Sequence, residues 1–135
     1  MSAVLHVPSG SRWALGPRTA LLVAAAAAGL AAAALANPHA MAGIEPELAT
    51  LLRGMALIKA CIALAAAGAV FWRLGRPVSR RVAAGYIGGI AALVGATVLI
   101  GCLSLLATAA VIFHLGALGL VTLAWCEGGA LGRAA

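Results

Sequence analysis

Four long apolar stretches account for most of the chain, and short polar segments separate them. The apolar stretches cover residues 19–36, 50–72, 82–103 and 107–125. A helix needs about 20 apolar residues to cross the hydrocarbon core of a bilayer. The pattern therefore predicts an all-α integral membrane protein with four transmembrane helices. Gly101 and Ser104 are the only residues that interrupt the apolar pattern between the last two stretches, so we expect a tight hairpin there.

The polar segments differ in charge, and this difference predicts the direction of the helices. Arginines lie before the first stretch, between the second and third, and after the fourth, whereas the segment between the first and second contains only acidic charges. Cytoplasmic loops carry an excess of basic residues. We therefore predict an up-down bundle in a bacterial-type inner membrane, with both termini in the cytoplasm. Residues 1–18, 73–81 and 126–135 would be cytoplasmic, and residues 37–49 would form an outer loop.

Composition supports a membrane location. The chain of 135 residues is 64% hydrophobic and only 9% charged, whereas about a quarter of the residues of a soluble protein are charged. The formal net charge of +6 comes from arginines at the ends of the spans, so we interpret it as a topology signal and not as a nucleic-acid interface. The three cysteines show no metal-ligand spacing, which argues against a disulfide framework or a zinc site.

The first stretch has an alternative interpretation as a signal peptide. It ends in Ala34-Leu35-Ala36, which has the small-residue pattern of a cleavage site. However, its apolar run is longer than the roughly 7 to 15 residues of a usual signal-peptide core. We therefore expect residues 19–36 to be retained as a transmembrane helix, with cleavage as the alternative.

Lys59, the only lysine of the chain, lies inside the second stretch. Counted from Trp72 and Trp125 as interfacial anchors, Lys59 and His114 lie at similar depths, about 20 Å and about 16 Å from the cytoplasmic interface. They are predicted to form a polar cluster facing the bundle interior, because membrane ionisable groups usually avoid lipid. No aspartate or glutamate lies in the four stretches. The ammonium could therefore extend towards the interface, be a neutral amine, or pair with an anionic ligand or a partner's carboxylate.

Further candidates for binding chemistry lie towards the outer surface. They are Arg53, His39, Met41, Glu45, Glu47 and Cys102. His39 and Met41, with His114, form a weak candidate metal set, since such donors suit copper. A b-type haem normally has two axial ligands, and only one histidine lies within a span. No cofactor is predicted, and haem and copper are kept as alternatives.

The third stretch carries a ridge of small residues. It comprises Gly85, Gly88, Gly89, Ala92 and Ala96, which recur at steps of three or four residues. Small residues at this spacing let helix backbones approach closely in membranes. The ridge predicts a tight helix contact, either within the chain or between chains. Tyr86 is interpreted as an interfacial residue, and the glycine-rich tail around Cys126 is expected to be disordered.

No catalytic constellation is visible, because the only acids lie in the outer loop and the tail. We therefore expect a small non-enzymatic membrane protein, an accessory or structural subunit that contacts lipid and another membrane subunit or a second copy of itself. The alternatives are a homo-oligomeric transporter or channel for an anion or metal ion, lined by Lys59 and His114, and a haem-bearing electron carrier. Small multidrug resistance transporters are similar in size, but they depend on an acidic residue in the first helix that this chain lacks.

Overall fold

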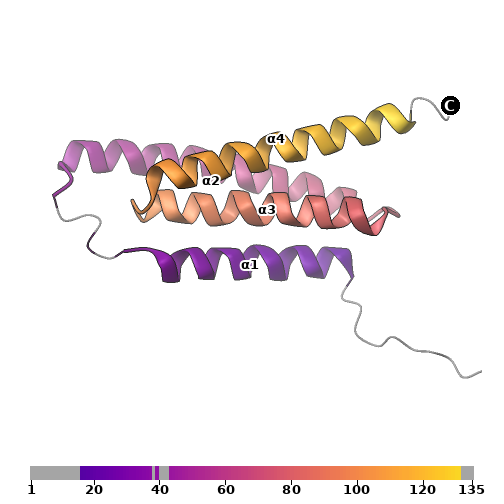
Figure 1. The fold of residues 1–135 in the computed structure, drawn as a ribbon, viewed down its shortest axis with the longest axis horizontal. Coiled ribbons are helices and arrows are strands. Elements are labelled where there is room, and N and C mark those ends of the chain that lie inside the picture. Colours follow the sequence, from indigo (N-terminus) through magenta and orange to yellow (C-terminus); the bar gives the residue numbers. More distant parts are fainter. Residues whose placement is uncertain (1–15, 38, 40–42, 132–135) are drawn as a thin grey trace, which may run out of the picture.

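The computed structural model describes residues 16–37, 39 and 43–131, which form four helices and no strand (Figure 1). Each helix is long and apolar enough to cross a membrane. The predicted all-α fold with four helices that could span a membrane is thus confirmed. The helices are α1 (Pro17–Leu35), α2 (Pro46–Arg73), α3 (Arg80–Gly101) and α4 (Leu106–Leu131).

Local sequence signals explain where the helices begin. Pro17 and Pro46 occupy the first turns of α1 and α2, where proline's fixed φ suits a helix and its missing N–H costs nothing. Ser79 caps α3, because its Oγ accepts the backbone N–H of Val82 at 3.4 Å.

Helix α2 begins at Pro46, ahead of the apolar stretch that starts at residue 50, because proline and the acidic Glu47 form a favourable first turn. Helix α4 continues beyond residue 125 to Leu131. The expectation of a disordered tail is therefore wrong up to Leu131, and the reason is an ion pair that holds Glu127, described below.

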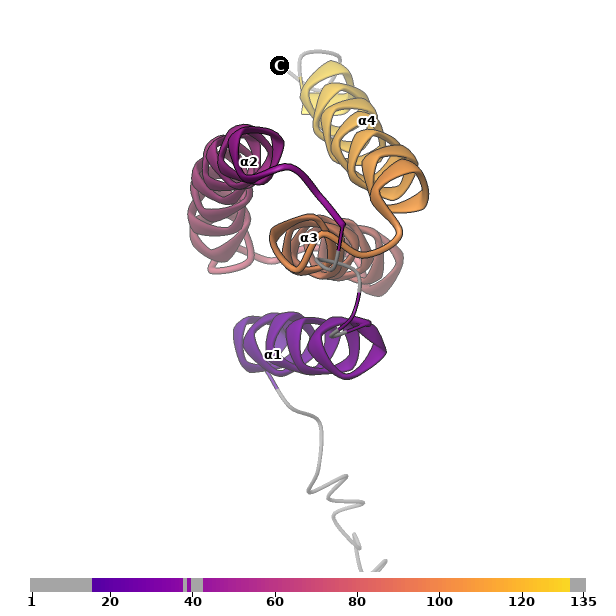
Figure 2. The same ribbon diagram turned by 90° about the vertical axis from the view of Figure 1, so that its left-hand side faces the viewer.

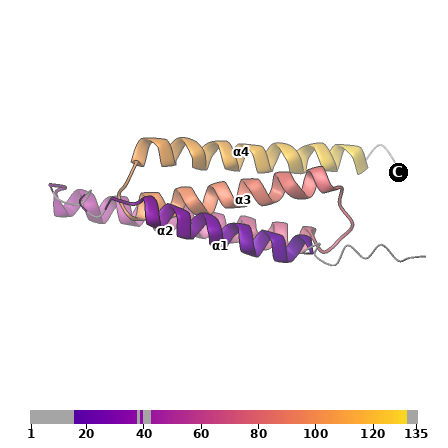
Figure 3. The same ribbon diagram turned by 60° about the horizontal axis from the view of Figure 1, so that its bottom comes forward.

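Helix α3 lies at the centre of the molecule. Figure 2 shows α1 packed on one side of α3, with α2 and α4 on the other, and Figure 3 shows α3 between α4 and α1. The backbones of α2 and α4 lie close to that of α3 but hardly approach each other. The most deeply buried side chains of α3 are those of Ile90, Leu93 and Ala96, which are at most 1% exposed. The core is therefore built around α3.

The small-residue ridge of α3 is used within the chain, mainly against α4. A Cβ atom added at Gly89 would lie 2.6 Å from Leu120 Cδ2, and one added at Gly85 would lie 3.0 Å from Leu123 Cδ2. On α4, a Cβ added at Gly116 would lie 3.2 Å from the Cβ of Ala92. Gly88, by contrast, faces no atom within 4 Å.

Helix α1 approaches the other side of α3 in a similar way. A Cβ added at Gly95 would lie 3.6 Å from the carbonyl oxygen of Ala28, and one at Gly29 would lie 3.6 Å from Val94 Cγ1. These distances correspond to ordinary van der Waals contact, so the α1–α3 interface is close but less crowded than the α3–α4 interface. Leu21 and Ala32 of α1 are buried in it.

The predicted tight hairpin between α3 and α4 is confirmed at residues 102–105. Leu103 and Leu105 have positive φ values of 54° and 49°, a conformation that is unfavourable for residues with a side chain. Ser104, between them, is only 4% exposed, and its Oγ accepts the backbone N–H of Asn37 at 2.9 Å. The buried hydroxyl therefore joins the hairpin to the segment that follows α1.

The contrast between Gly89 and Gly88 provides a test of the α3–α4 interface. Gly89→Leu should lower the free energy of unfolding by roughly 1–3 kcal/mol, because the new side chain overpacks the contact with Leu120. Gly88→Leu is the matched control, since it brings the same gain in helix propensity without a neighbour to meet. Both can be compared by SDS-induced unfolding in detergent micelles followed by circular dichroism. Equal midpoints for the two variants would contradict the packing described here.

The hairpin provides a second test. Leu105→Gly should raise the free energy of unfolding by about 0.5–1 kcal/mol, because glycine adopts positive φ without the cost of about 1–2 kcal/mol that leucine bears. The Leu105 side chain is 60% exposed, so little packing is lost. Leu103→Gly relieves the same strain but removes a buried side chain, and it should destabilise the protein by about 2 kcal/mol or more. Unfolding midpoints that move in the same direction would argue against this account.

Candidate functional site

Lys59 lies on the face of α2 that is directed towards α4. Its Nζ atom is 4.2 Å from the centroid of the Phe113 ring, and the residue is half-buried. Across the part of the chain that the structure describes, Lys59 forms no ion pair. A cation over an aromatic face is stabilised by about 0.5–1 kcal/mol at exposed sites and about 2 kcal/mol or more when desolvated. Phe113 is thus an aromatic partner for Lys59 that the sequence analysis did not consider.

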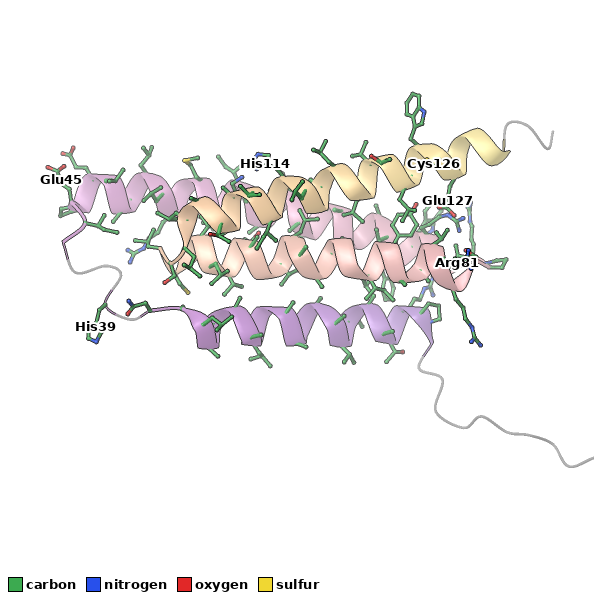
Figure 4. The ribbon with its side chains drawn as sticks, in the orientation of Figure 1. His39, Glu45, Arg81, His114, Cys126 and Glu127 are labelled. Carbon is green, nitrogen blue, oxygen red and sulfur yellow. The ribbon has the colours of Figure 1, made fainter. Side chains whose placement is uncertain are left out.

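His114 lies beside this contact but points away from it. Phe113 is buried, and because each helical residue turns by about 100°, the following residue is directed outward. The His114 side chain is exposed on the isolated chain, and Figure 4 shows it on the outer side of α4. Lys59 and His114 are predicted to lie at similar depths in the membrane. The Lys59–Phe113 contact agrees with this prediction, because Phe113 directly precedes His114. The predicted inward direction of His114 is wrong, because Phe113 occupies the inward position.

The His114 ring is oriented by its own helix. Its Nδ1 atom lies 2.7 Å from the carbonyl oxygen of Ala110, and a carbonyl can only accept, so Nδ1 carries the proton. In the neutral ring this leaves Nε2 as an acceptor directed away from the bundle. The ring also meets that of Phe113 edge to face, with centroids 5.9 Å apart.

A polar network that the sequence analysis missed joins three helices at one end of the bundle. Arg73 Nη2, at the end of α2, donates to Glu127 Oε1 of α4 at 2.9 Å. The hydroxyl of Tyr86, on α3, donates to Glu127 Oε2 at 2.7 Å. Figure 4 shows Glu127 at the end of the bundle where Arg81 lies. Each oxygen of the carboxylate therefore accepts a hydrogen bond from a different helix.

This network corrects two earlier interpretations. Glu127 lies in α4, in a helical segment, Leu106–Gly128, that is long and apolar enough to cross a membrane, and it pairs with Arg73 and not with Lys59. Tyr86 is 5% exposed and is part of the network, not simply an interfacial residue. Glu127 lies 14 residues after Phe113, as Arg73 lies 14 residues after Lys59, but this equal spacing indicates the ion pair only once the contact of Lys59 with Phe113 is known.

Arg53 lines a groove near the hairpin. The groove has a volume of about 400 Å³ and lies between α2 and α3. Its other lining residues are Ala56, Leu57, Ala60, Thr97 and Gly101. Cys102 follows directly after α3 and is half-buried. The predicted outer-face residues Arg53 and Cys102 thus lie towards the same end of the molecule.

Among the described residues, the remaining outer candidates do not form a binding cluster. Glu45 and Glu47 are exposed at the start of α2, and the backbone N–H of His39 donates to Asn37 Oδ1. Met41 lies outside the described residues. Figure 4 shows His39 and His114 well apart, and the described residues contain no group of three or more histidines, cysteines, aspartates or glutamates arranged to hold a metal ion. The His39–Met41–His114 set is therefore not brought together by the described fold.

A second groove follows the line between α2 and α4. It has a volume of about 380 Å³, and we call it the α2–α4 groove. Its lining residues are Ala66, Ala69, Val70, Trp72, Arg73, Tyr86, Leu120, Val121 and Ala124. Lys59 lies two turns before Ala66 on the same face of α2. Lys59 and the α2-side lining of the groove therefore share one face of α2.

No protein-family model, curated protein or solved structure matches this chain.

The Glu127 network provides a quantitative prediction. Glu127→Gln should lower the free energy of unfolding by roughly 1–3 kcal/mol, because it leaves the half-buried Arg73 without a charged partner. Tyr86→Phe should cost about 1 kcal/mol. The double variant should cost less than the sum of the two, because Glu127→Gln already replaces the charged acceptor of the Tyr86 hydroxyl with a weaker neutral amide and leaves less for Tyr86→Phe to remove. SDS-induced unfolding in micelles measures all three variants, with the exposed Arg81→Gln as control. Strict additivity would show that Tyr86 and Glu127 do not interact.

Proposed function

We propose that the chain is a small, non-enzymatic accessory subunit of a membrane complex in a bacterial-type inner membrane. In this proposal it spans the bilayer four times, up and down, with both termini in the cytoplasm. The charge distribution supports this orientation, because five arginines cluster at the end formed by the start of α1, the end of α2 and the start of α3. They are Arg18, Arg73, Arg76, Arg80 and Arg81. Basic residues favour the cytoplasmic side.

Retention of the first helix is part of the proposal. Arg18 Nε donates to the carbonyl oxygen of Phe71 at 3.1 Å, which joins the start of α1 to the end of α2. At the other end, the backbone N–H of Asn37 donates to Ser104. Between these contacts α1 packs along α3. Loss of residues 1–36 by cleavage would expose the α1-facing side of α3, which supports α1 as a permanent part of the protein.

The proposed partner site is the line formed by Lys59 and the α2–α4 groove. A lysine near the centre of a membrane helix costs about 3 kcal/mol, and the Phe113 ring offsets only about 0.5–2 kcal/mol of that cost. The observation that carries the proposal is therefore the half-buried ammonium of Lys59, which contacts an aromatic ring but forms no ion pair in the described part of the chain. The partner that fits is a transmembrane helix with a carboxylate at this depth, because it would offset the rest of the cost.

The position of His114 favours a second candidate, a homo-oligomeric transporter or channel for an anion or metal ion. Its imidazole is exposed on the isolated chain, close in level to Lys59. Because His114 points away from the bundle, a polar pathway lined by both residues would have to form between copies of the chain. This candidate requires self-association, and it predicts that Lys59→Ala and His114→Ala reduce ion flux into vesicles.

A comparison of two variants tests the partner site. Lys59→Met removes the ammonium, whereas Phe113→Leu removes its aromatic contact and keeps the charge. If the ammonium binds a partner's carboxylate, native mass spectrometry in mild detergent should show a heteromeric complex that Lys59→Met loses and Phe113→Leu retains. Arg53→Met, another cationic residue of α2, is the matched control and should retain the complex.

Three outcomes distinguish the candidates. Equal loss of the complex in the Lys59 and Phe113 variants would assign Lys59 to packing within the chain. Retention of the complex in Lys59→Met would remove the charge-pairing role. A wild-type mass that is a multiple of 13.3 kDa would favour the homo-oligomer. In a heteromeric complex, Lys59→Glu should be rescued by a lysine in place of the partner's acidic residue.

A further inference from the structure

A third groove lies at the arginine-rich end, on the opposite side of α3 from the partner site. It has a volume of about 630 Å³ and is formed by the first turn of α1, the segment before α3 and the first turns of α3. The lining residues that matter most here are Pro17, Ala20, Arg76, Arg80, Ala84 and Ile87. Two arginines therefore contribute to a groove whose remaining surface is mostly small and apolar.

The electrostatic environment of this groove favours an anion. Both α1 and α3 begin at the groove, and the N-terminal end of a helix is electropositive. Among the described residues at this end, Glu127 is the only carboxylate, and it is already paired with Arg73. The guanidinium carbon of Arg76 lies 4.6 Å from the Trp72 ring centroid. Stacking uses the face of a guanidinium and leaves its N–H groups available to an anion.

We propose that this groove binds an anionic phospholipid. Its phosphate would meet the guanidinium groups of Arg76 and Arg80, and one acyl chain would lie along Ala20, Ala84 and Ile87. The apolar lining favours a lipid over a free phosphate, because inorganic phosphate gains nothing from contact with alanine and isoleucine side chains. Basic pockets between helices at the cytoplasmic side of a membrane bind acidic headgroups by the same combination of charge and apolar contact. The two grooves share no lining residue, so variants at Arg80 and Ala84 test this proposal independently of the partner site.

Lipid titration followed by native mass spectrometry tests this proposal. The delipidated full chain is titrated with phosphatidylglycerol, with phosphatidylcholine as the zwitterionic control. Arg80→Gln should weaken phosphatidylglycerol binding about fivefold, the factor that corresponds to about 1 kcal/mol per arginine near a membrane surface. Arg76→Gln should have a similar effect. Arg81→Gln is the matched control, since it removes the same charge from an adjacent exposed residue that does not line the groove.

A second pair of variants separates the groove from general surface charge. Ala84→Phe places a large side chain on the apolar lining of the groove and leaves every arginine in place, so it should reduce phosphatidylglycerol binding, whereas Ala65→Phe on the exposed side of α2 should not. Circular dichroism confirms that each variant is folded. Equal weakening by Arg80→Gln and Arg81→Gln, equal binding of the two lipids, or full binding by Ala84→Phe would each overturn the proposal. Displacement of the lipid by millimolar inorganic phosphate would show a free-anion site and would overturn it as well.

Discussion

The close approach of helix backbones along α3 is the constraint on which the rest of the structure depends. In a bilayer, lipid tails are as apolar as the helix surfaces, so helices gain little from hiding apolar area and must gain from tight packing and polar contacts. Glycine and alanine allow this on two sides of α3. Gly89 admits Leu120 of α4, and Gly95 lies against the α1 backbone at Ala28. Because α3 packs against all three other helices, it is the most deeply buried helix.

A consequence of this central position is that α2 and α4 are held apart and meet through side chains. Two cation contacts join them: Lys59 with Phe113, and Arg73 with Glu127. The partners are 14 residues apart on each helix, which corresponds to about 21 Å. The two contacts therefore lie in matching order on helices that run in the same direction. The Lys59–Phe113 contact joins α2 and α4 near the middle of the two helices, and the Arg73–Glu127 ion pair joins them at one end. The α2–α4 groove lies between these two contacts.

The sequence predicted those features of the structure that depend on local signals, and it did not predict those that depend on how the helices pack. Apolar length identified four helices, and Pro17, Pro46 and Ser79 explain three of the starts, because these signals act locally. The side of α3 that each neighbour occupies could not be predicted, since alanine and glycine occur all around these helices and give no apolar face. The same reasoning applies to the candidate site. The depth of Lys59 could be counted along its helix, whereas the Phe113 ring beside it depends on how α2 and α4 are arranged about α3.

Some charged groups of the described chain have hydrogen-bonding or ionic partners within it, whereas others contact only an aromatic ring. We assign their roles from this difference. Glu127 receives hydrogen bonds from Arg73 and Tyr86, so both of its oxygens are satisfied within the chain, and its role is to hold three helices together. Lys59 receives only a ring face, which offsets part of the cost of its charge. Arg76 likewise contacts the face of an aromatic ring, that of Trp72.

A cation stacked on an aromatic ring is held in position while its N–H groups still lack an acceptor. That combination suits a group that must be ordered before an anion arrives, which is why Lys59 and Arg76, and not Arg73, are the positions at which we expect an external carboxylate or phosphate.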